Sequence, residues 1–260
     1  MRIGSLAGRA AWVLACASMI IIPRSAALAQ GSLTPPGAPA PTFKTLDEVR
    51  PGTPISSLPF SITNPGVYFV SKPLTSTSGG ITINSSDVSL DLMGFTLDGG
   101  GSSSSGVEIN HVNRAVVRNG TVRNFSLAGV YVVSPATNAL IEDITLQGCT
   151  NGAGIELDGT ASTVQRCRAY QNKVGIYVLG GHNHVIDSCQ AVGNTQNGFL
   201  ITGTNNLVIR NLAANAPSSD YGIYQSNYVG AVVLPAPTLT VTNNGGPGSG
   251  TTDPFANLRY

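Results

Sequence analysis

Apolar residues recur along the chain in a four-residue pattern: glycine, apolar, variable, apolar. Its first copy is Gly80-Ile81-Thr82-Ile83, and later copies begin after steps of 21–26 residues. The two apolar residues are two positions apart, which is the period of a strand and not of a helix. A repeat this short cannot bury its apolar face alone, so the pattern predicts stacked coils. The copies begin at Gly80, Gly106, Gly129, Gly154, Gly175, Gly198 and Gly222.

Each copy continues with a second apolar run, a polar residue and a third short strand signal. After Gly129 these are Leu140-Ile141-Glu142, Asp143 and Ile144-Thr145-Leu146. Asparagine and aspartate tolerate left-handed backbone, so the polar residue predicts a bend. The expected fold is all-β, a single-stranded parallel β-helix with three strands in each of roughly seven coils. The expected bend residues are Asn119, Asp143, Arg166, Ser188 and Asn211.

Stacked coils place equivalent residues about 4.8 Å apart, and the pattern then predicts columns of inward side chains. The first column is Ile81, Val107, Val130, Ile155, Ile176, Phe199 and Ile223. The second is Ile83, Ile109, Val132, Leu157, Val178 and Ile201. The third strand contributes Ile144, Cys167, Cys189 and Leu212. In the seventh copy Gln225 occupies the second apolar position, so we expect the regular core to end there.

The first 29 residues have the pattern of a signal peptide. Arg2 and Arg9 supply positive charge, residues 10–22 are apolar, and Ala27-Leu28-Ala29 matches the cleavage pattern. We therefore expect a secreted, periplasmic or cell-surface protein, without stable membrane insertion after cleavage, because the apolar run is too short. A lipoprotein signal ending at Cys16 is the alternative, which the continuation of the apolar run beyond Cys16 disfavours.

Four segments follow the signal peptide. Residues 30–41 form a proline-rich arm, and residues 42–79 are an N-terminal cap or first coil. Within it, a short helix is expected from Thr45 and a strand at Gly66–Val70. Residues 80–225 are the repeats, and residues 226–260 form a last partial coil and a C-terminal cap, since solenoid ends need covering.

Composition narrows the possible partners. Only 10% of the 260 residues are charged and the net charge is +1, so no field attracts nucleic acid. Cleavage of the signal leaves Cys149, Cys167 and Cys189, and an odd number argues against a disulfide framework. Cys167 and Cys189 are expected to stack as reduced thiols, although their spacing also permits a disulfide. No cofactor is indicated.

The repeats of residues 80–225 resemble the right-handed parallel β-helix, or pectin-lyase-like, superfamily. The proline-rich arm followed by Lys44-Thr45-Leu46-Asp47 is similar to the start of exported bacterial β-helix proteins. The resemblance implies right-handed coils and a groove along the outer face of the first strand of each coil. It implies no activity, because this fold carries many. Gly181-His182-Asn183 departs from the Gly-His-Gly motif of polygalacturonases. The Asp-Gly-Phe-Asp motif of alginate epimerases and the Trp-Ile-Asp-His motif of pectate lyases are also absent, so no catalytic residue is carried over.

The variable position of the pattern provides the candidate chemistry. Its outward column is Thr82, Glu108, Tyr131, Glu156, Tyr177, Leu200 and Tyr224, and the next is Asn110, Val133, Asp158, Leu179 and Thr202. Carboxylates beside tyrosines suit a polysaccharide. The candidate catalytic residues are Glu108, Glu156 and Asp158, and the candidate ligand-binding residues are Tyr131, Tyr177, Tyr224 and Asn110. Glu108 and Glu156 would be roughly 9.6 Å apart at Cα, near the separation used in inverting hydrolysis.

The leading hypothesis is a non-catalytic exported protein that binds polysaccharide or another envelope component through this face. The alternatives are a polysaccharide-active hydrolase, lyase or epimerase, and a purely structural stalk. The basic candidates near these strands are His111, Lys173 and Arg114, and so few cations disfavour polyuronate substrates. His182 and His184 could both face outward, but a third ligand is missing, so no metal site is predicted. A second-strand column is read as a solvated ladder of charges: Asp91, Arg118, Glu142, Gln165, Asp187 and Arg210.

Overall fold

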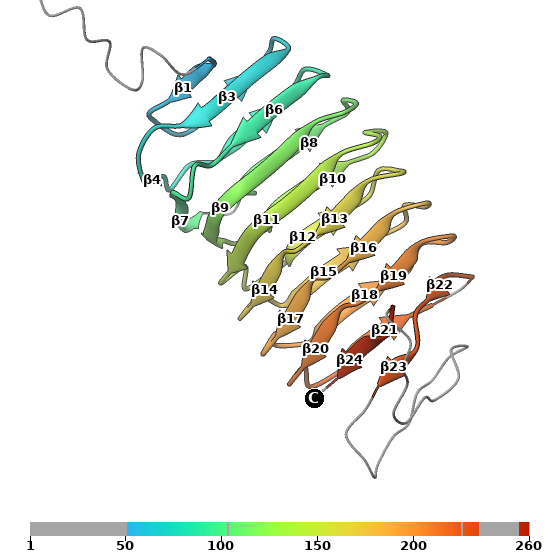
Figure 1. The fold of residues 1–260 in the computed structure, drawn as a ribbon. Coiled ribbons are helices and arrows are strands. Elements are labelled where there is room, and N and C mark those ends of the chain that lie inside the picture. The colour runs from blue at the N-terminus through green and yellow to red at the C-terminus, as the bar shows by residue number, and fades with distance from the viewer. Residues whose placement is uncertain (1–50, 103, 225, 234–254, 260) are drawn as a thin grey trace, which may run out of the picture. The chain divides into compact units, whose positions relative to one another are not determined.

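The computed structural model describes residues 51–102, 104–224, 226–233 and 255–259. The expected signal peptide, the arm, the helix at Thr45 and Gln225 lie outside these residues. The described residues form strands and no helix, and the strands follow one another as successive rungs (Figure 1). None of the described segments is a helix with the length and apolarity needed to cross a bilayer.

The glycine strands form one parallel sheet of eight strands, called here the glycine sheet. In order, its strands are β2 (Phe60–Ile62), β5 (Ile81–Ile83), β8 (Val107–Asn110), β10 (Ala128–Val133), β12 (Ala153–Leu157), β15 (Val174–Val178), β18 (Asn197–Ile201) and β21 (Ser219–Ile223). The sheet begins one rung before the first predicted copy, because Phe60-Ser61-Ile62 pairs with Ile81-Thr82-Ile83.

The second and third strands of the coils share a sixteen-stranded sheet. Its members before residue 150 are β1 (Thr53–Ile55), β3 (Gly66–Val70), β4 (Leu74–Thr75), β6 (Val88–Asp91), β7 (Thr96–Ser102), β9 (Val116–Phe125) and β11 (Leu140–Gln147). The later ones are β13 (Thr163–Gln165), β14 (Arg168–Tyr170), β16 (Val185–Asp187), β17 (Gln190–Val192), β19 (Leu207–Ile209), β20 (Leu212–Ala214), β22 (Tyr228–Val229), β23 (Val232–Val233) and β24 (Asn257–Arg259). The strand expected at Gly66–Val70 is β3 and is confirmed.

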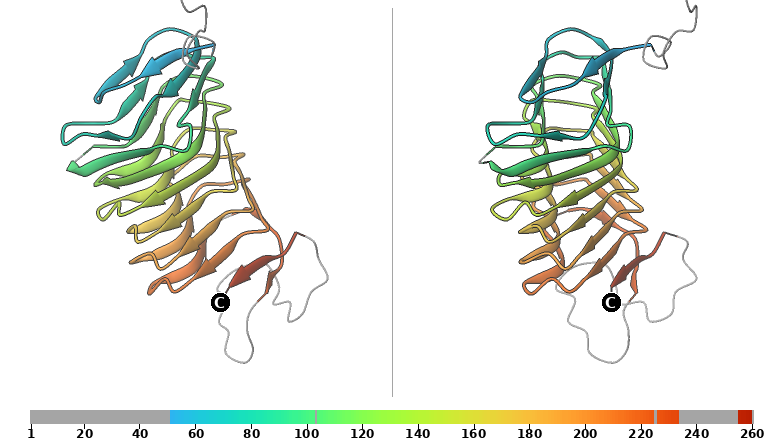
Figure 2. Two further views of the ribbon diagram at one scale, coloured as in Figure 1. Left: turned by 60° about the vertical axis from the view of Figure 1, so that its left-hand side comes forward. Right: turned by 90° about the vertical axis from the view of Figure 1, so that its left-hand side faces the viewer.

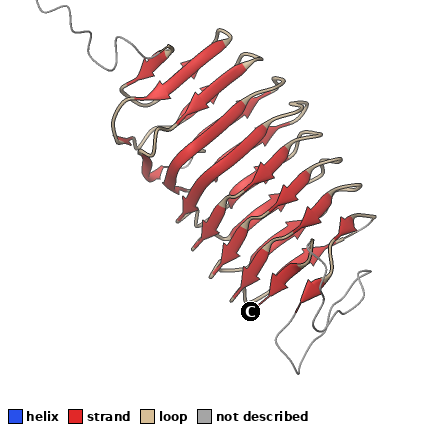
Figure 3. Cartoon of the chain, in the orientation of Figure 1, coloured by secondary structure: helices blue, strands red, loops and turns tan. Residues whose placement is uncertain are grey.

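The predicted fold class, a right-handed parallel β-helix of about seven coils, is confirmed. Both further views show the two sheets enclosing a common interior (Figure 2). In β9 and β11 the second and third strands run on as one strand, whereas later coils divide them with a loop (Figure 3).

Bends between the second and third strands use left-handed backbone. Four of the predicted positions have positive φ: Asn119 (60°), Asp143 (54°), Arg166 (52°) and Ser188 (55°). The fifth prediction, Asn211, is wrong, because Arg210 has the positive φ of 56°. The reason is the register: Val185 pairs with Leu207, so this coil is offset by one residue from its expected alignment.

Two further predictions fail through the same offset. Ile209, not Arg210, pairs with Asp187 in the charge column, although the Arg210 Nε still donates to Asp187 Oδ1 at 2.7 Å. Leu212 pairs with Gln190 and not with Cys189, so Leu212 is not in the inward column. The preceding part of the charge column, from Asp91 to Asp187, has the predicted register.

The inward columns of the glycine sheet are buried as predicted up to Phe199 and Ile201. The recurring glycines are required by a close approach between coils. A Cβ atom at each of the first six would lie 1.9–2.7 Å from the carbonyl oxygen of the equivalent residue in the next coil. No side chain fits in that space, so the glycine column allows the strands to stack.

The seventh copy is displaced by one position. Phe199 pairs with Tyr221, and Leu200 pairs with Gly222. The Tyr221 ring stacks on Phe199 at 5.1 Å between centroids, with 6° between planes. Its hydroxyl donates to the carbonyl oxygen of Asn211 at 2.8 Å. The predicted place of Ile223 is therefore wrong, because Tyr221 fills the first column and Ile223 pairs with Ile201 in the second.

Buried asparagines form hydrogen-bonded ladders between coils, and sequence reasoning missed them. Asn172 Oδ1 accepts from the backbone N–H of Cys149 at 2.9 Å, and Asn194 Oδ1 accepts from that of Asn172 at 3.0 Å. Asn211 does the same for Cys189 at 2.8 Å. These amides satisfy backbone groups that the turns would otherwise leave buried and unpaired.

His184 occupies a position in such a ladder. Its Nδ1 accepts from the backbone N–H of Ser162 at 3.1 Å, so Nε2 carries the hydrogen and donates to the Gly159 carbonyl at 3.0 Å. His184 is fully buried, and burial lowers its pKa to about 4. His182 is exposed, so these two histidines do not both face outward.

The three cysteines of the described residues are free and buried. Cys167 and Cys189 belong to neighbouring rungs, next to the paired residues Arg168 and Gln190. Burial raises the pKa of the Cys149 thiol to about 12, so this thiol is protonated at neutral pH.

Candidate functional site

Four predicted residues lie side by side on the outer face of the glycine sheet. Tyr131 pairs with Glu108 on one side and with Glu156 on the other, and Glu156 pairs with Tyr177. All four side chains are half-buried. They face outward because each stands between two buried apolar residues of its strand, as strand alternation requires. We call these four residues the Glu–Tyr row.

The carboxylates of this row give it a negative potential. Burial, and then the neighbouring charges of Glu156, Asp158 and Glu108, raise the pKa of the Tyr131 hydroxyl. Burial also raises the pKa of Glu156, and the charge of Asp158 raises it further. Both shifts favour the protonated forms, since a negative charge here has little solvent and a negative neighbour.

Arginines neutralise the carboxylates elsewhere but not here. Among the ten carboxylates of the described residues, seven pair with an arginine: Asp87, Asp91, Asp98, Glu142, Asp143, Asp187 and Asp220. The three without such a pair are Glu108, Glu156 and Asp158. The unneutralised carboxylates of the described chain therefore gather on one face, beside two tyrosines.

The remaining predicted residues lie around the row. Asp158 directly follows Leu157, the last residue of β12, and comes two residues after Glu156. Asn110 Nδ2 donates to Asn84 Oδ1 at 2.8 Å, and Asn84 Nδ2 donates to Ser61 Oγ at 2.9 Å. Asn110 is therefore part of a series of hydrogen-bonded side chains that runs toward the first coils.

The predicted place of Tyr224 in the outward column is wrong. Gly222 takes that place, because the stacking of Tyr221 on Phe199 shifts the last copy by one residue. Tyr224 is exposed one rung beyond Thr202 and is not aligned with Tyr177.

A hollow of about 370 Å³ adjoins the row. Glu156, Tyr177 and Leu200 line it from the sheet, and Leu127, Lys173 and Gln196 line it from the turns that precede the glycine strands. Of these three turn residues, sequence reasoning singled out only Lys173, as a nearby cation. It missed Leu127 and Gln196, although their positions just before glycine strands place them at the edge of this face.

The histidines near this face do not complete a metal site. His111 is an exposed turn residue with a φ of 60°. Within the described ranges, no three His, Cys, Asp or Glu side chains are grouped as a metal ion would require.

Comparison with known proteins identifies the family. The model of the right-handed beta helix region matches residues 75–244, which is more than half of the chain. The chain belongs to the right-handed beta helix family. The comparison with curated proteins gave no match.

Solved structures resemble this right-handed beta helix in fold alone. Pectate lyase Pel9A is 13% identical over 68% of this chain and 57% of its own, with a TM-score of 0.41. ORF18 of Geobacillus virus E2 is 11% identical over 64% and 44%, with a TM-score of 0.42. A double mutant of the periplasmic alginate epimerase AlgG is 12% identical over 74% and 61%, with a TM-score of 0.38. The chain thus spans 44–61% of the length of these proteins.

Proposed function

We propose that this protein is an exported β-helix that binds polysaccharide along the Glu–Tyr row without cleaving it. The observation that carries this proposal is the gathering of Glu108, Glu156 and Asp158, none paired with an arginine, around Tyr131 and Tyr177. A carboxylate kept as a structural ion pair would have its cation nearby, as the other seven do. These three instead keep their acceptor oxygens available.

The chemistry of the row suits hydroxyl-rich chains. Ionised carboxylates only accept hydrogen bonds, and sugar hydroxyls supply donors. Tyrosine rings combine apolar area with a polar tip at a small cost in conformational entropy, so they pack against the C–H faces of sugar rings. The carboxylates recur at every second strand, about 9.6 Å apart, which favours an extended polymer along the helix axis.

The hollow beside Glu156 and Tyr177 would hold one sugar unit more deeply than the rest of the row. Leu127 and Leu200 contribute apolar area to it, while Lys173 and Gln196 contribute donors. A sugar has both kinds of surface, so this mixed lining favours a saccharide over a purely apolar ligand.

Calorimetric titration with neutral oligosaccharides of glucose, mannose and N-acetylglucosamine tests the proposal. We expect Tyr131→Ala and Tyr177→Ala each to weaken binding at least tenfold, which is about 1.4 kcal/mol. Tyr228→Ala is the matched control, because Tyr228 is 67% exposed and lies in the other sheet. If the wild-type protein binds none of these sugars, or both row variants bind as well as the control, the Glu–Tyr row is not a binding face.

Hydrolysis is the second candidate, favoured by the raised pKa of Glu156. A carboxylic acid with a raised pKa is better suited to act as a general acid. Glu108 would be the partner across Tyr131, two strands away. Product analysis after incubation with the same polymers tests this role: Glu156→Gln and Glu108→Gln should each abolish products. Cleavage that persists in both variants would exclude these carboxylates as its catalysts.

Export is supported by the signal-peptide pattern of residues 1–29. N-terminal sequencing of protein secreted by an expressing bacterium should begin at Gln30. A protein recovered only with Met1 intact would contradict export through this signal. A stalk without a ligand, the remaining alternative, predicts no saccharide binding in the titration above.

A further inference from the structure

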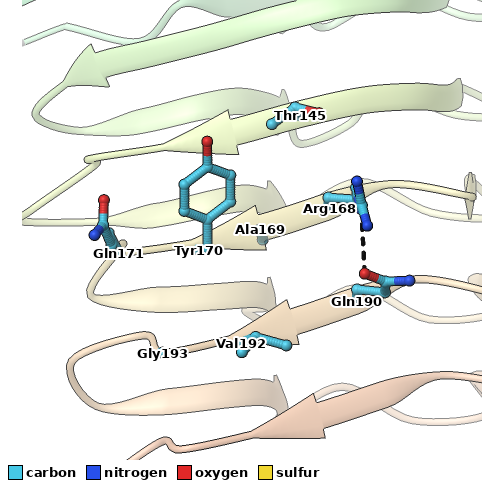
Figure 4. A pocket seen from close by; sticks show the side chains of 8 residues that line it. All are labelled: Thr145, Arg168, Ala169, Tyr170, Gln171, Gln190, Val192 and Gly193. Carbon is cyan, nitrogen blue, oxygen red and sulfur yellow. Dashed lines mark hydrogen bonds between the residues drawn. The ribbon is translucent and has the colours of Figure 1, made fainter.

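A second hollow, of about 610 Å³, lies on the outer face of the third strands, away from the Glu–Tyr row. The residues that line it belong to β11, β14 and β17, three neighbouring rungs of the larger sheet, and to the turns that follow β14 and β17. Figure 4 shows Arg168 and Tyr170 on its middle rung and Gln190 and Val192 on the next.

Strand geometry explains why the hollow forms here. Arg168 and Tyr170 are two residues apart on one face of β14, so their Cα atoms are about 6.6 Å apart. Ala169 between them points inward and is buried, which leaves backbone as the floor. On the following rung Val192 pairs with Tyr170 and is followed by Gly193, which has no side chain. Little side-chain volume therefore lies beside the Tyr170 ring.

Arg168 differs from the other arginines. Seven arginines lie in the described residues, and six of them pair with a carboxylate: Arg114, Arg118, Arg123, Arg166, Arg210 and Arg259. Arg168 instead donates from Nε to the neutral Gln190 Oε1 at 3.1 Å. Within the described residues its charge is not neutralised by an ion pair, and a guanidinium fork suits a planar anion such as a carboxylate.

Tyr170 forms a fixed wall beside this cation. Its hydroxyl donates to Gln147 Oε1 at 2.9 Å, and Gln147 Nε2 donates to Gln171 Oε1 at 2.7 Å. This chain of hydrogen bonds holds the ring toward the preceding rung, on the same face of the sheet as Arg168 (Figure 4). The ring is therefore oriented before any ligand arrives, which lowers the entropy cost of binding.

We propose that this hollow is a second saccharide site, which takes a sugar unit carrying an anionic group. The carboxylate or sulfate of the sugar pairs with Arg168, the ring packs against Tyr170, and Gln190 hydrogen-bonds a hydroxyl. The distance of about 6.6 Å between the two strand positions matches a ring and its charged substituent lying side by side. This site goes beyond the neutral polysaccharide proposed for the Glu–Tyr row, whose unneutralised carboxylates would repel an anion.

Titration with three matched disaccharides tests the site: one neutral, one carrying a carboxylate and one carrying a sulfate. The wild-type protein should bind at least one anionic disaccharide ten times more tightly than the neutral one. Arg168→Gln should abolish this preference, and Tyr170→Ala should weaken binding of both kinds of sugar at this site. Raised salt should weaken the anionic disaccharide selectively, because screening acts on the charge pair.

Two control variants separate this site from the paired arginines and from the Glu–Tyr row. Arg123→Gln removes a cation of the same sheet that pairs with Asp98 at 2.7 Å, and it should keep the preference for the anionic sugar. Tyr131→Ala disables the Glu–Tyr row, and this variant should also keep the preference for the anionic sugar. Failure of the row and failure of this site are therefore distinguishable.

Three results would overturn the site. They are equal affinity for neutral and anionic sugars, an Arg168→Gln variant that binds as the wild type does, and inorganic sulfate competing as well as the sulfated sugar. The last would show an ion-binding arginine and no saccharide site.

Discussion

At the scale of single residues, a missing Cβ atom determines how closely the coils stack. A methyl group on Gly154 would lie 2.7 Å from the carbonyl oxygen of Gly175 and 3.0 Å from the Cβ of Ala169. Neither neighbour can move alone, because one is ladder backbone and the other is a buried core residue. The glycine is therefore selected by space and not by an unusual backbone angle.

Gly154→Ala should reduce the free energy of unfolding by about 1–3 kcal/mol, the usual cost of overpacking. Urea denaturation monitored by circular dichroism measures it. Gly180→Ala is the matched control, because its only near neighbour would be Asp158 Oδ1 at 3.7 Å. Equal stability of the two variants would contradict a role for close approach.

His184 should make stability depend on pH. Its pKa of about 4 in the folded state lies below the ordinary value of 6.5, so the unfolded chain binds the proton first. The stabilisation is complete above pH 6.5 and declines as the pH falls toward 4. Between pH 7.5 and pH 5 we expect a loss of about 2 kcal/mol.

The control for this pH effect is His184→Asn, which keeps an amide in the ladder and removes the titrating ring. Comparison of urea unfolding at both pH values should show a smaller change in the variant. The arginine-paired aspartates change the free energy of unfolding little between pH 7.5 and pH 5. Hydrogen bonding to Arg210 lowers the pKa of Asp187 below 3.8, so the stability that such a group contributes is lost only at lower pH. A pH dependence unchanged by His184→Asn would assign it to other groups.

At the scale of elements, buried asparagines link the turns of neighbouring coils by hydrogen bonds. Asn194 is buried; its Oδ1 accepts from the Asn172 N–H at 3.0 Å, and its Nδ2 donates to the Ala169 carbonyl at 3.0 Å. One side chain therefore joins two rungs and closes the turn between the third strand and the next glycine strand.

Asn194→Ala should reduce the free energy of unfolding by about 2–4 kcal/mol, because it leaves a buried N–H and a buried carbonyl without these partners. Thermal unfolding compared with Asn151→Ala tests this. Asn151 is an exposed turn residue whose Nδ2 donates to Ser126 Oγ, so its loss should be nearly neutral. A loss at Asn194 no greater than at Asn151 would argue against a stabilising ladder.

The sequence was sufficient to predict the columns where apolar period and stacking agree. Ile81 through Phe199 follow the expected inward column, and Glu108, Tyr131, Glu156 and Tyr177 follow the outward one. The prediction failed where a polar or aromatic residue turns inward. Tyr221 stacks inside on Phe199 and Asn211 is buried in a ladder, and each depends on a partner one rung away that a single repeat does not reveal.

At the scale of the whole molecule, charges are distributed by face. Apart from Arg259–Asp220, which joins the two sheets, the arginine pairs lie along the larger sheet, where each exposed pair contributes little to stability. The unpaired carboxylates lie on the face of the glycine sheet. Arg168 is the unpaired arginine of the described chain, on a different face from those carboxylates. The pairing that distinguishes these residues is set by contacts between coils, so composition and net charge could not indicate it.

In-register stacking has a consequence for how such a chain can change length. Val174 pairs with Ala153, so removing residues 153–173 would join one rung to the equivalent point of the next. Every later side chain would keep its face, and Tyr131 would then neighbour Tyr177. Removing residues 153–162 instead would break the alignment of all later rungs.

We expect the whole-coil deletion to stay folded and to melt cooperatively at a lower temperature, while the partial deletion should lose its cooperative transition. Calorimetry of the two deletions tests this, and similar melting of both would contradict it.

The molecule can therefore lengthen or shorten only in steps of one coil, about 4.8 Å each. Related proteins of this fold would then differ in axial length by whole numbers of coils.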